Sequence, residues 1–121
     1  MNKKDAFDRL MFALNKRDWA LRQENAKIGT YNRYLKVVTE CANELIEQGR
    51  QDEMLPLLEN KSVSIMKDAA DALYACYPEI CGAKLKEISR MTVKDGLEKC
   101  YVLPAVSAAM AFEYGDLKDK K

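Results

Sequence analysis

Carboxylate side chains at helical spacing are the part of this sequence that could support chemistry. In two segments such residues repeat at steps of three or four, which places each set on one face of a helix. A row of this kind can bind a basic protein, can supply an acid and a base for catalysis, or can be an ordinary solvated helix face. The two sets are Glu40, Glu44 and Glu47, followed by Asp68, Asp71 and the aromatic Tyr74.

Histidine is absent from the sequence. Without it, serine and cysteine nucleophiles lack their usual general base, and metal sites that use histidine cannot form. The five glycines are scattered and form no phosphate-binding loop. We therefore predict a protein that is not an enzyme and that uses no cofactor, no metal and no small-molecule substrate. An enzyme that relies on Asp, Glu, Tyr or Lys alone is the alternative.

Four cysteines lie within apolar helical patterns and form no CxxC pair: Cys41, Cys76, Cys81 and Cys100. We interpret them as reduced core residues, with a disulfide or redox role as the alternative. No segment has the pattern of a signal peptide or approaches the ~20 apolar residues of a transmembrane helix. The sequence therefore predicts a cytoplasmic protein without a membrane partner.

Charge is distributed unevenly along the chain, although the formal net charge is only +1. Residues 1–36 contain nine Lys or Arg and four acids, whereas residues 37–80 contain three Lys or Arg and nine acids. The middle of the chain is therefore acidic, and long-range attraction would speed its encounter with a basic partner.

Apolar residues recur with helical spacing along nearly the whole chain, and no segment alternates as a strand does. Pro56 is expected in or near the first turn of its helix, where a missing N–H costs least. Residues 92–99 are predicted as a loop or broken turn. The last helix is apolar nearly all round, which indicates burial on several sides. The predicted helices span about 5–25, 30–49, 51–59, 62–77, 78 to at least 88, and 101–114.

Short turns between these helices predict three antiparallel pairs, at about 5–49, 51–77 and 78–114. Pairs of this kind stack side by side, and about three are needed to bury a continuous core. The predicted fold is therefore all-α, a short α-solenoid within a single domain spanning 1–121. The tail at 116–121 is expected to fray.

The central pair resembles a HEAT-like hairpin in two segments: 57–63, with the sequence LLENKSV, and 68–73, with the sequence DAADAL. In such hairpins a Leu pair ends the first helix, a polar turn follows, and the second helix carries a Val and then an Ala-Ala step. Residues 77–88 together with 105–112 look like a weaker second copy. The chain departs from the family pattern after the turn, where Ser64 or Ile65 replaces the usual Arg.

The chain as a whole is similar to small stand-alone bacterial HEAT-like proteins, which include immunity proteins that neutralise contact-dependent toxins. In that arrangement the second helices line a concave surface. The resemblance therefore implies that the two acidic sets are neighbours there, with Tyr74 as an aromatic anchor. It predicts a protein-binding domain, specifically an immunity protein that binds a basic toxin domain such as a nuclease.

The basic N-terminal third supports a second hypothesis, a helical domain that binds nucleic acid. Lys and Arg would contact phosphates there, and aromatic rings would stack on bases. Against this, a net charge of +1 is low for a dedicated nucleic-acid binder. The residues concerned are Lys16, Arg17, Arg22, Lys27, Arg33 and Lys36, beside Trp19, Tyr31 and Tyr34.

Overall fold

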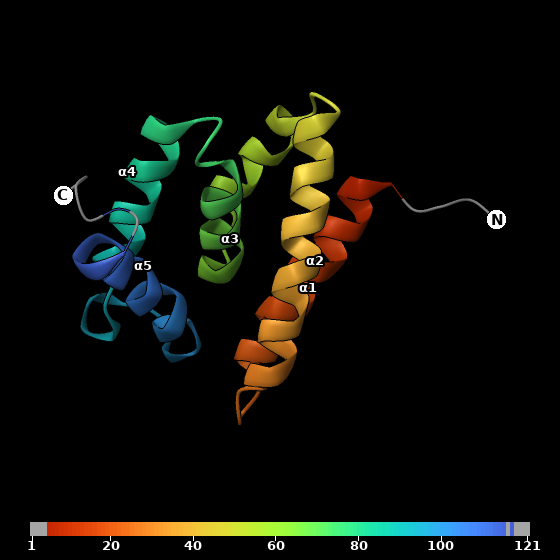
Figure 1. Ribbon diagram of the computed structural model, residues 1–121. Helices are drawn as coiled ribbons and strands as arrows, with labels where there is room; N and C mark the ends of the chain where they lie inside the picture. The colour runs from red at the N-terminus through yellow and green to blue at the C-terminus, as the bar shows by residue number, and fades with distance from the viewer. Residues whose placement is uncertain (1–4, 116, 118–121) are drawn as a thin grey trace.

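Figure 1 shows the computed structural model, which describes residues 5–115 and 117. This part of the chain contains helices and turns and no strand, so the all-α prediction is confirmed. The α-helices are α1 (Ala6–Arg22), α2 (Ile28–Glu47), α3 (Val63–Leu73), α4 (Pro78–Ser89) and α5 (Val102–Tyr114), and the 3-10 helices are η1 (Gln51–Glu59), η2 (Val93–Asp95) and η3 (Lys99–Tyr101).

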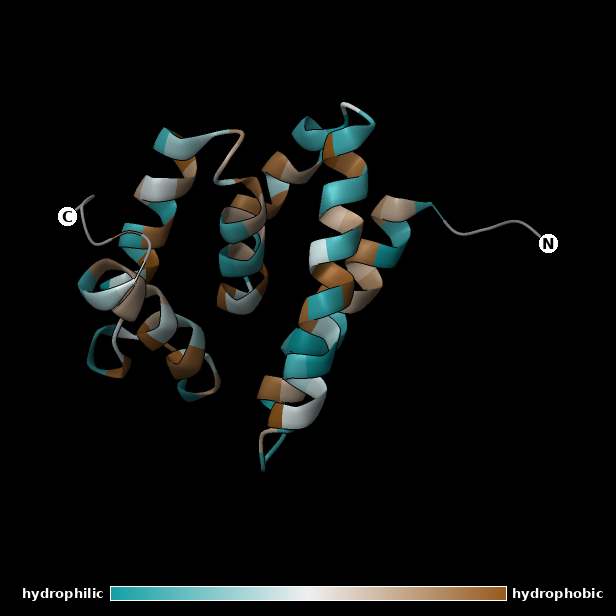
Figure 2. Cartoon of the chain, viewed as in Figure 1, coloured by the Kyte–Doolittle hydropathy of each residue, from teal (hydrophilic) through white to brown (hydrophobic). Residues whose placement is uncertain are grey.

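The first two helices, α1 and α2, form an antiparallel pair (Figure 1). Asp5 caps α1 by accepting a hydrogen bond from the N–H of Phe7. Gly49 follows α2 with a φ of 71°, the left-handed conformation in which glycine commonly ends a helix. Hydrophilic and hydrophobic residues alternate along α2 in Figure 2, as expected for a helix with one buried side.

The predicted third helix is a 3-10 helix, η1, and not an α-helix. Pro56 is the sixth of its nine residues, well beyond the first turn where we expected it. There the ring removes an N–H donor and would clash with the carbonyl of an α-helix. The segment still buries Met54, Leu57 and Leu58 against α3.

The helix α3 lies between the α1–α2 pair and the α4–α5 pair, and it packs against both pairs and η1 (Figure 1). It begins where the Ser62 hydroxyl accepts a hydrogen bond from the N–H of Ile65. It ends at Leu73, earlier than the predicted residue 77. Because neighbours surround α3, eight of its eleven residues are buried.

The last helices, α4 and α5, pack against each other. Residues 92–99 between them contain no α-helix and form a broken turn, as predicted; it includes the short η2, which Gly96 caps at a φ of 109°. Burial of α5 on several sides, however, was predicted wrongly. Neighbours cover only the side that carries Ala105, Ala108 and Phe112, and the opposite side is exposed.

The pair of η1 and α3 contacts the α1–α2 pair on one side and the α4–α5 pair on the other, and η3 also contacts α1. The hydroxyl of Tyr101 donates to Asp18 at 2.6 Å and accepts a hydrogen bond from Arg22 at 3.0 Å. The assignment of these pairs to HEAT-like repeats remains a prediction. Fraying is predicted for residues 116–121 and remains a prediction: Leu117 is buried, and the rest of that segment lies outside the described residues.

An ion-pair network joins the start of α1 to the start of η1. Arg50 donates to both carboxylate oxygens of Asp5, at 2.7 and 2.9 Å, and to Glu53. The hydrogen bonds from Arg50 lower the pKa of Asp5 from 3.8 to about 2. An acid with a lowered pKa stabilises the fold above its unfolded pKa, and this contribution disappears as the pH falls through about 2.

In the Arg50→Ala variant we expect the pKa of Asp5 to rise toward 3.8, because the guanidinium that holds the charged form is gone. Titration of the Asp5 carboxyl carbon by NMR measures this. A pKa that stays near 2 in the variant would show that the N–H groups of the helix start, and not Arg50, lower it.

Candidate partner-binding surface

The sequence pattern predicted that Asp68 lies on an exposed face of α3, and this prediction is wrong. The side chain of Asp68 is only 4% exposed and pairs with Arg17 of α1, which is equally buried. Arg17 donates to the two carboxylate oxygens at 2.8 and 3.1 Å. Burial raises the pKa of Asp68, and the guanidinium opposes that increase. Asp68 therefore holds α3 to α1 and cannot contact a partner.

Part of the basic N-terminal third is also used inside the molecule. Besides pairing with Asp68, Arg17 donates to the backbone carbonyl of the buried Tyr31 and lies 3.8 Å from the centre of its ring. Arg22 contacts Glu98 and Tyr101. Arg17 and Tyr31 are buried, so the nucleic-acid hypothesis loses one arginine and one ring, whereas the side chain of Arg22 remains 49% exposed.

The glutamates of α2 lie on the side of that helix away from α3. Glu44 forms an ion pair with Arg9 of α1, and Glu40 lies 3.9 Å from Lys36. Glu47 is exposed near the end of the helix. None of these glutamates lines the cavity between α2 and α3.

That cavity has a volume of about 200 Å³, and Asp71 is the exposed acid among the residues that line it. A carboxylate oxygen of Asp71 lies 2.6 Å from the ammonium of Lys67. The α2 side of the cavity is formed by Leu35, Thr39 and Asn43 among others. Tyr74 is half-buried beside a different cavity, of about 310 Å³, next to α4. The structure therefore separates the two acidic sets, and they do not form one acidic groove.

A different surface brings aromatic and charged side chains together on α1 and α2, on the side of the pair away from α3. Phe12 and Trp19 of α1 are 53% and 44% exposed. The ring of Tyr34 meets Phe12 edge to face, with centroids 6.1 Å apart. We call this surface the hairpin outer face and define it by Arg9, Phe12, Lys16, Trp19, Arg33, Tyr34, Glu40 and Glu44.

Cations are held over the rings of the hairpin outer face. The ammonium of Lys16 lies 5.7 Å from the centre of the Phe12 ring and 5.3 Å from that of Trp19. The guanidinium of Arg33 lies 5.3 Å from the Tyr34 ring. Such contacts favour a fixed orientation of the rings while the face stays open to solvent. The rings of this surface are therefore restrained by neighbouring cations while Phe12 and Trp19 stay exposed.

No family model, curated protein or solved structure matches the chain. The choice of a site therefore depends on the geometry of this chain alone. The sequence pattern singled out Trp19, as a ring beside the basic residues of the N-terminal third, but not Phe12. The signal was present, because Phe12, Lys16 and Trp19 follow each other at steps of four and three and so share one face of α1.

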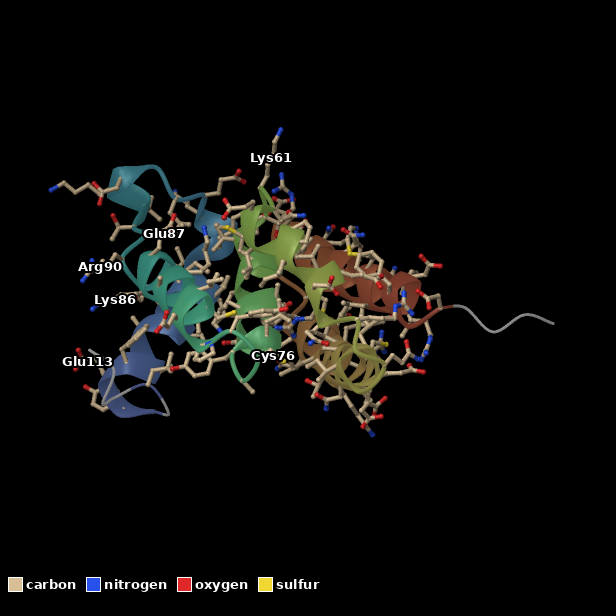
Figure 3. All side chains as sticks on the ribbon, turned by 90° about the horizontal axis from the view of Figure 1, so that it is seen from above. Lys61, Cys76, Lys86, Glu87, Arg90 and Glu113 are labelled. Atoms are coloured by element: carbon tan, nitrogen blue, oxygen red, sulfur yellow. The ribbon has the colours of Figure 1, made fainter. Side chains whose placement is uncertain are left out.

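A further cavity, of about 440 Å³, lies between α4 and the η2–η3 turns. Figure 3 labels three of its charged residues, Lys61, Glu87 and Arg90. Asp95 and Glu98 add two carboxylates, and Glu98 already pairs with Arg22. The only aromatic residue that lines this cavity, Tyr101, is buried, whereas the hairpin outer face exposes the rings of Phe12 and Trp19, so the hairpin outer face is the better candidate.

The described residues contain no grouping of side chains for a metal ion, no disulfide and no helix that could cross a membrane. Within residues 5–115 and 117, no three His, Cys, Asp or Glu side chains are grouped as a metal ion would require. The four cysteines are free thiols. Burial raises the pKa of Cys81 to about 11, so its reactive thiolate form is rare at neutral pH. No helix in the described part of the chain is both long and apolar enough to cross a bilayer.

Proposed function

We propose that this chain is a protein-binding domain that contacts its partner through the hairpin outer face. In its more specific form, the proposal is that the chain is an immunity protein, which occupies the surface of a bacterial toxin domain and neutralises it. The observation that carries the proposal is the aromatic cluster of the exposed Phe12 and Trp19 with the partly buried Tyr34, whose rings lie under the cations of Lys16 and Arg33.

The residue types of this cluster support binding to a protein. Trp, Tyr and Arg are enriched among the residues whose truncation costs a protein interface about 2 kcal/mol or more. Exposed rings lose little conformational entropy on binding, because they have few rotatable bonds and here already contact their neighbours. A partner can therefore bury these rings at a low cost in conformational entropy.

The charges around the cluster describe the partner. Lys16 and Arg33 suit carboxylates, whereas Glu40 and the exposed Glu47 suit Lys or Arg. A toxin domain with an apolar pocket at the centre of its contact surface, and basic residues toward one side, would satisfy both. The predicted basic toxin remains compatible with this surface, although the contact involves α2 with α1 and not α2 with α3.

Affinity capture from a lysate of the source organism tests the proposal. We expect the wild-type chain to recover one protein in equimolar amount, and the Trp19→Ala, Lys16→Glu variant to lose it, because both changes fall on the hairpin outer face. Co-expression then tests the specific form: the wild-type chain, and not the variant, should restore growth of cells that produce the captured protein.

A matched control changes charges elsewhere. The Glu59→Lys, Asp71→Lys variant replaces exposed acids of η1 and α3, so it should capture the partner as the wild type does. Loss of capture in this control together with full capture by the Trp19→Ala, Lys16→Glu variant would overturn the assignment of the surface. A captured protein that does not impair growth would overturn the immunity function alone.

Binding of single-stranded nucleic acid is the second candidate, because stacked rings with adjacent cations also bind unpaired bases. It predicts that nuclease treatment removes the captured material. It also predicts that affinity for an oligonucleotide falls steeply with salt and falls further in the Arg33→Ala variant. Capture that survives nuclease treatment excludes this alternative for that partner.

A further inference from the structure

An open cleft on the hairpin outer face lies between two exposed rings of α1. Phe12 and Trp19 are about two turns apart on one side of the helix, with Asn15 and Lys16 between them. These four side chains line a cleft of about 320 Å³. Tyr34 of α2 supports one wall, because its ring packs edge to face against Phe12. The cleft therefore combines apolar ring surface with two polar side chains.

Both polar side chains of the cleft can donate hydrogen bonds to an anion. Lys16 carries an ammonium and Asn15 an amide. The ammonium lies 5.7 Å from the centre of the Phe12 ring and 5.3 Å from that of Trp19, so it stays beside the two rings. Among the described residues that line the cleft there is no acid. The cleft is therefore positively charged.

Lys16 is a half-buried cation that lacks a carboxylate partner. It forms no ion pair with any of residues 5–115 and 117. Two acids of the hairpin outer face are already paired elsewhere, Glu44 with Arg9 and Glu40 with Lys36. A partly desolvated charge is stabilised when an opposite charge binds beside it. The charge of Lys16 is therefore available to a bound molecule.

We propose that this cleft binds the side chain of a glutamate from the protein partner, an inference that rests on the function proposed above. The carboxylate accepts hydrogen bonds from Lys16 and Asn15, and charge strengthens the first of these. The two methylene groups of the glutamate lie against the rings of Phe12 and Trp19. An aspartate has one methylene group fewer and buries less apolar surface there.

The position of the cleft along α1 favours a side-chain carboxylate over the carboxylate at the end of a chain. A terminal carboxylate is commonly bound by free backbone N–H groups. The cleft lies in the middle of α1, where the backbone N–H groups donate within the helix. Only the side chains of Lys16 and Asn15 remain as donors, and these suit a carboxylate that a partner's side chain carries into the cleft.

Fluorescence titration measures binding at the cleft directly, because Trp19 is the single tryptophan of the chain. The probes are two peptides with blocked ends, Gly-Leu-Glu-Leu-Gly and Gly-Leu-Gln-Leu-Gly, which differ in the charge of the central residue. At low ionic strength we expect a Kd of roughly 1 mM for the glutamate peptide and roughly 10-fold weaker binding of the glutamine peptide. In Lys16→Met, which keeps an apolar stem without the charge, both peptides should bind equally.

The matched control is Lys86→Met, which removes the same charge from another half-buried lysine. Lys86 lies on α4, outside the hairpin outer face (Figure 3). This variant should keep the preference of the wild type for the glutamate peptide. Circular dichroism checks that both variants remain helical, as expected for single substitutions away from the core.

Three results would overturn the proposal. The first is a wild-type chain that binds the glutamate peptide no more tightly than the glutamine peptide, and the second is a Lys16→Met variant that keeps the preference. The third is inorganic phosphate that changes the emission of Trp19 at lower concentrations than the glutamate peptide does, which would favour nucleic acid. The first two results leave the protein-binding function standing, because capture by the wild type and its loss in Trp19→Ala, Lys16→Glu test that function separately.

Discussion

Replacing Arg17 by Met is expected to reduce the free energy of unfolding by about 3 to 5 kcal/mol, the usual cost of removing one partner of a buried ion pair. The substitution leaves the carboxylate of Asp68 in a site where it is 4% exposed. It also removes the hydrogen bond to the carbonyl of Tyr31 and the stacking on its ring. Three helices, α1, α2 and α3, lose a common contact.

The instability of Arg17→Met should decrease at lower pH. Burial raises the pKa of Asp68, and without the guanidinium only the charge of Lys67 opposes that increase. An acid whose folded pKa exceeds its unfolded value destabilises the fold when it is charged. Stability of the variant should therefore recover as the pH falls through the raised folded pKa toward the unfolded value of 3.8.

Urea denaturation followed by circular dichroism measures both effects. The double variant Arg17→Met, Asp68→Leu is the informative comparison, because an apolar pair often replaces a buried ion pair at little cost. It should be more stable than Arg17→Met. If Arg17→Met were as stable as the wild type at neutral pH, the pair would not anchor α3 to α1.

Truncation of Leu73 to Ala should cost about 2 to 5 kcal/mol. This side chain is fully buried in the last turn of α3, the helix that every other α-helix contacts. The site is enclosed by several elements that cannot all move inward, so a cavity should remain after truncation. Poor collapse places the expected cost in the upper half of that range.

The control for Leu73→Ala is Leu35→Ala, which removes the same atoms from an exposed position on α2. Surface truncations of this kind change stability by about 0.5 kcal/mol or less. Thermal or urea unfolding of the two variants compares them directly. Equal losses in both would mean that the core is not centred on α3.

Helical periodicity was sufficient to predict the all-α class and the approximate positions of α1, α2 and α4, because each buries one side and exposes the other. It failed where tertiary packing decided the outcome. The spacing of Asp68 and Asp71 suggested one solvated face, yet Asp68 points inward because α3 is covered on nearly every side. Its partner, Arg17, lies 51 residues earlier, a distance over which helical spacing has no meaning.

The surroundings of α5 and of the acidic stripe on α2 could not be predicted from hydrophobic patterning. The residues of α5 are apolar nearly all round, but this composition does not determine how many sides of the helix other elements cover. Here one side is left uncovered. The stripe Glu40, Glu44 and Glu47 was located correctly on one face of α2, but the direction of that face depends on the rotation of α2 relative to α1. The apolar residues that α2 buries, such as Val38 and Leu45, set that rotation, and it leaves Glu44 close enough to Arg9 to form an ion pair.

Asp18 links the first helix to residues that lie much later in the sequence. Its carboxylate accepts hydrogen bonds from Ser62, 44 residues later, and from Tyr101, 83 residues later. A linear stack of hairpins can assemble from one end as each unit leaves the ribosome, because every unit needs only its predecessor. Here the hydrogen bond from Tyr101 to Asp18 of the first helix can form only after residue 101 has been synthesised. The contacts of α1 are therefore completed only when most of the chain is present.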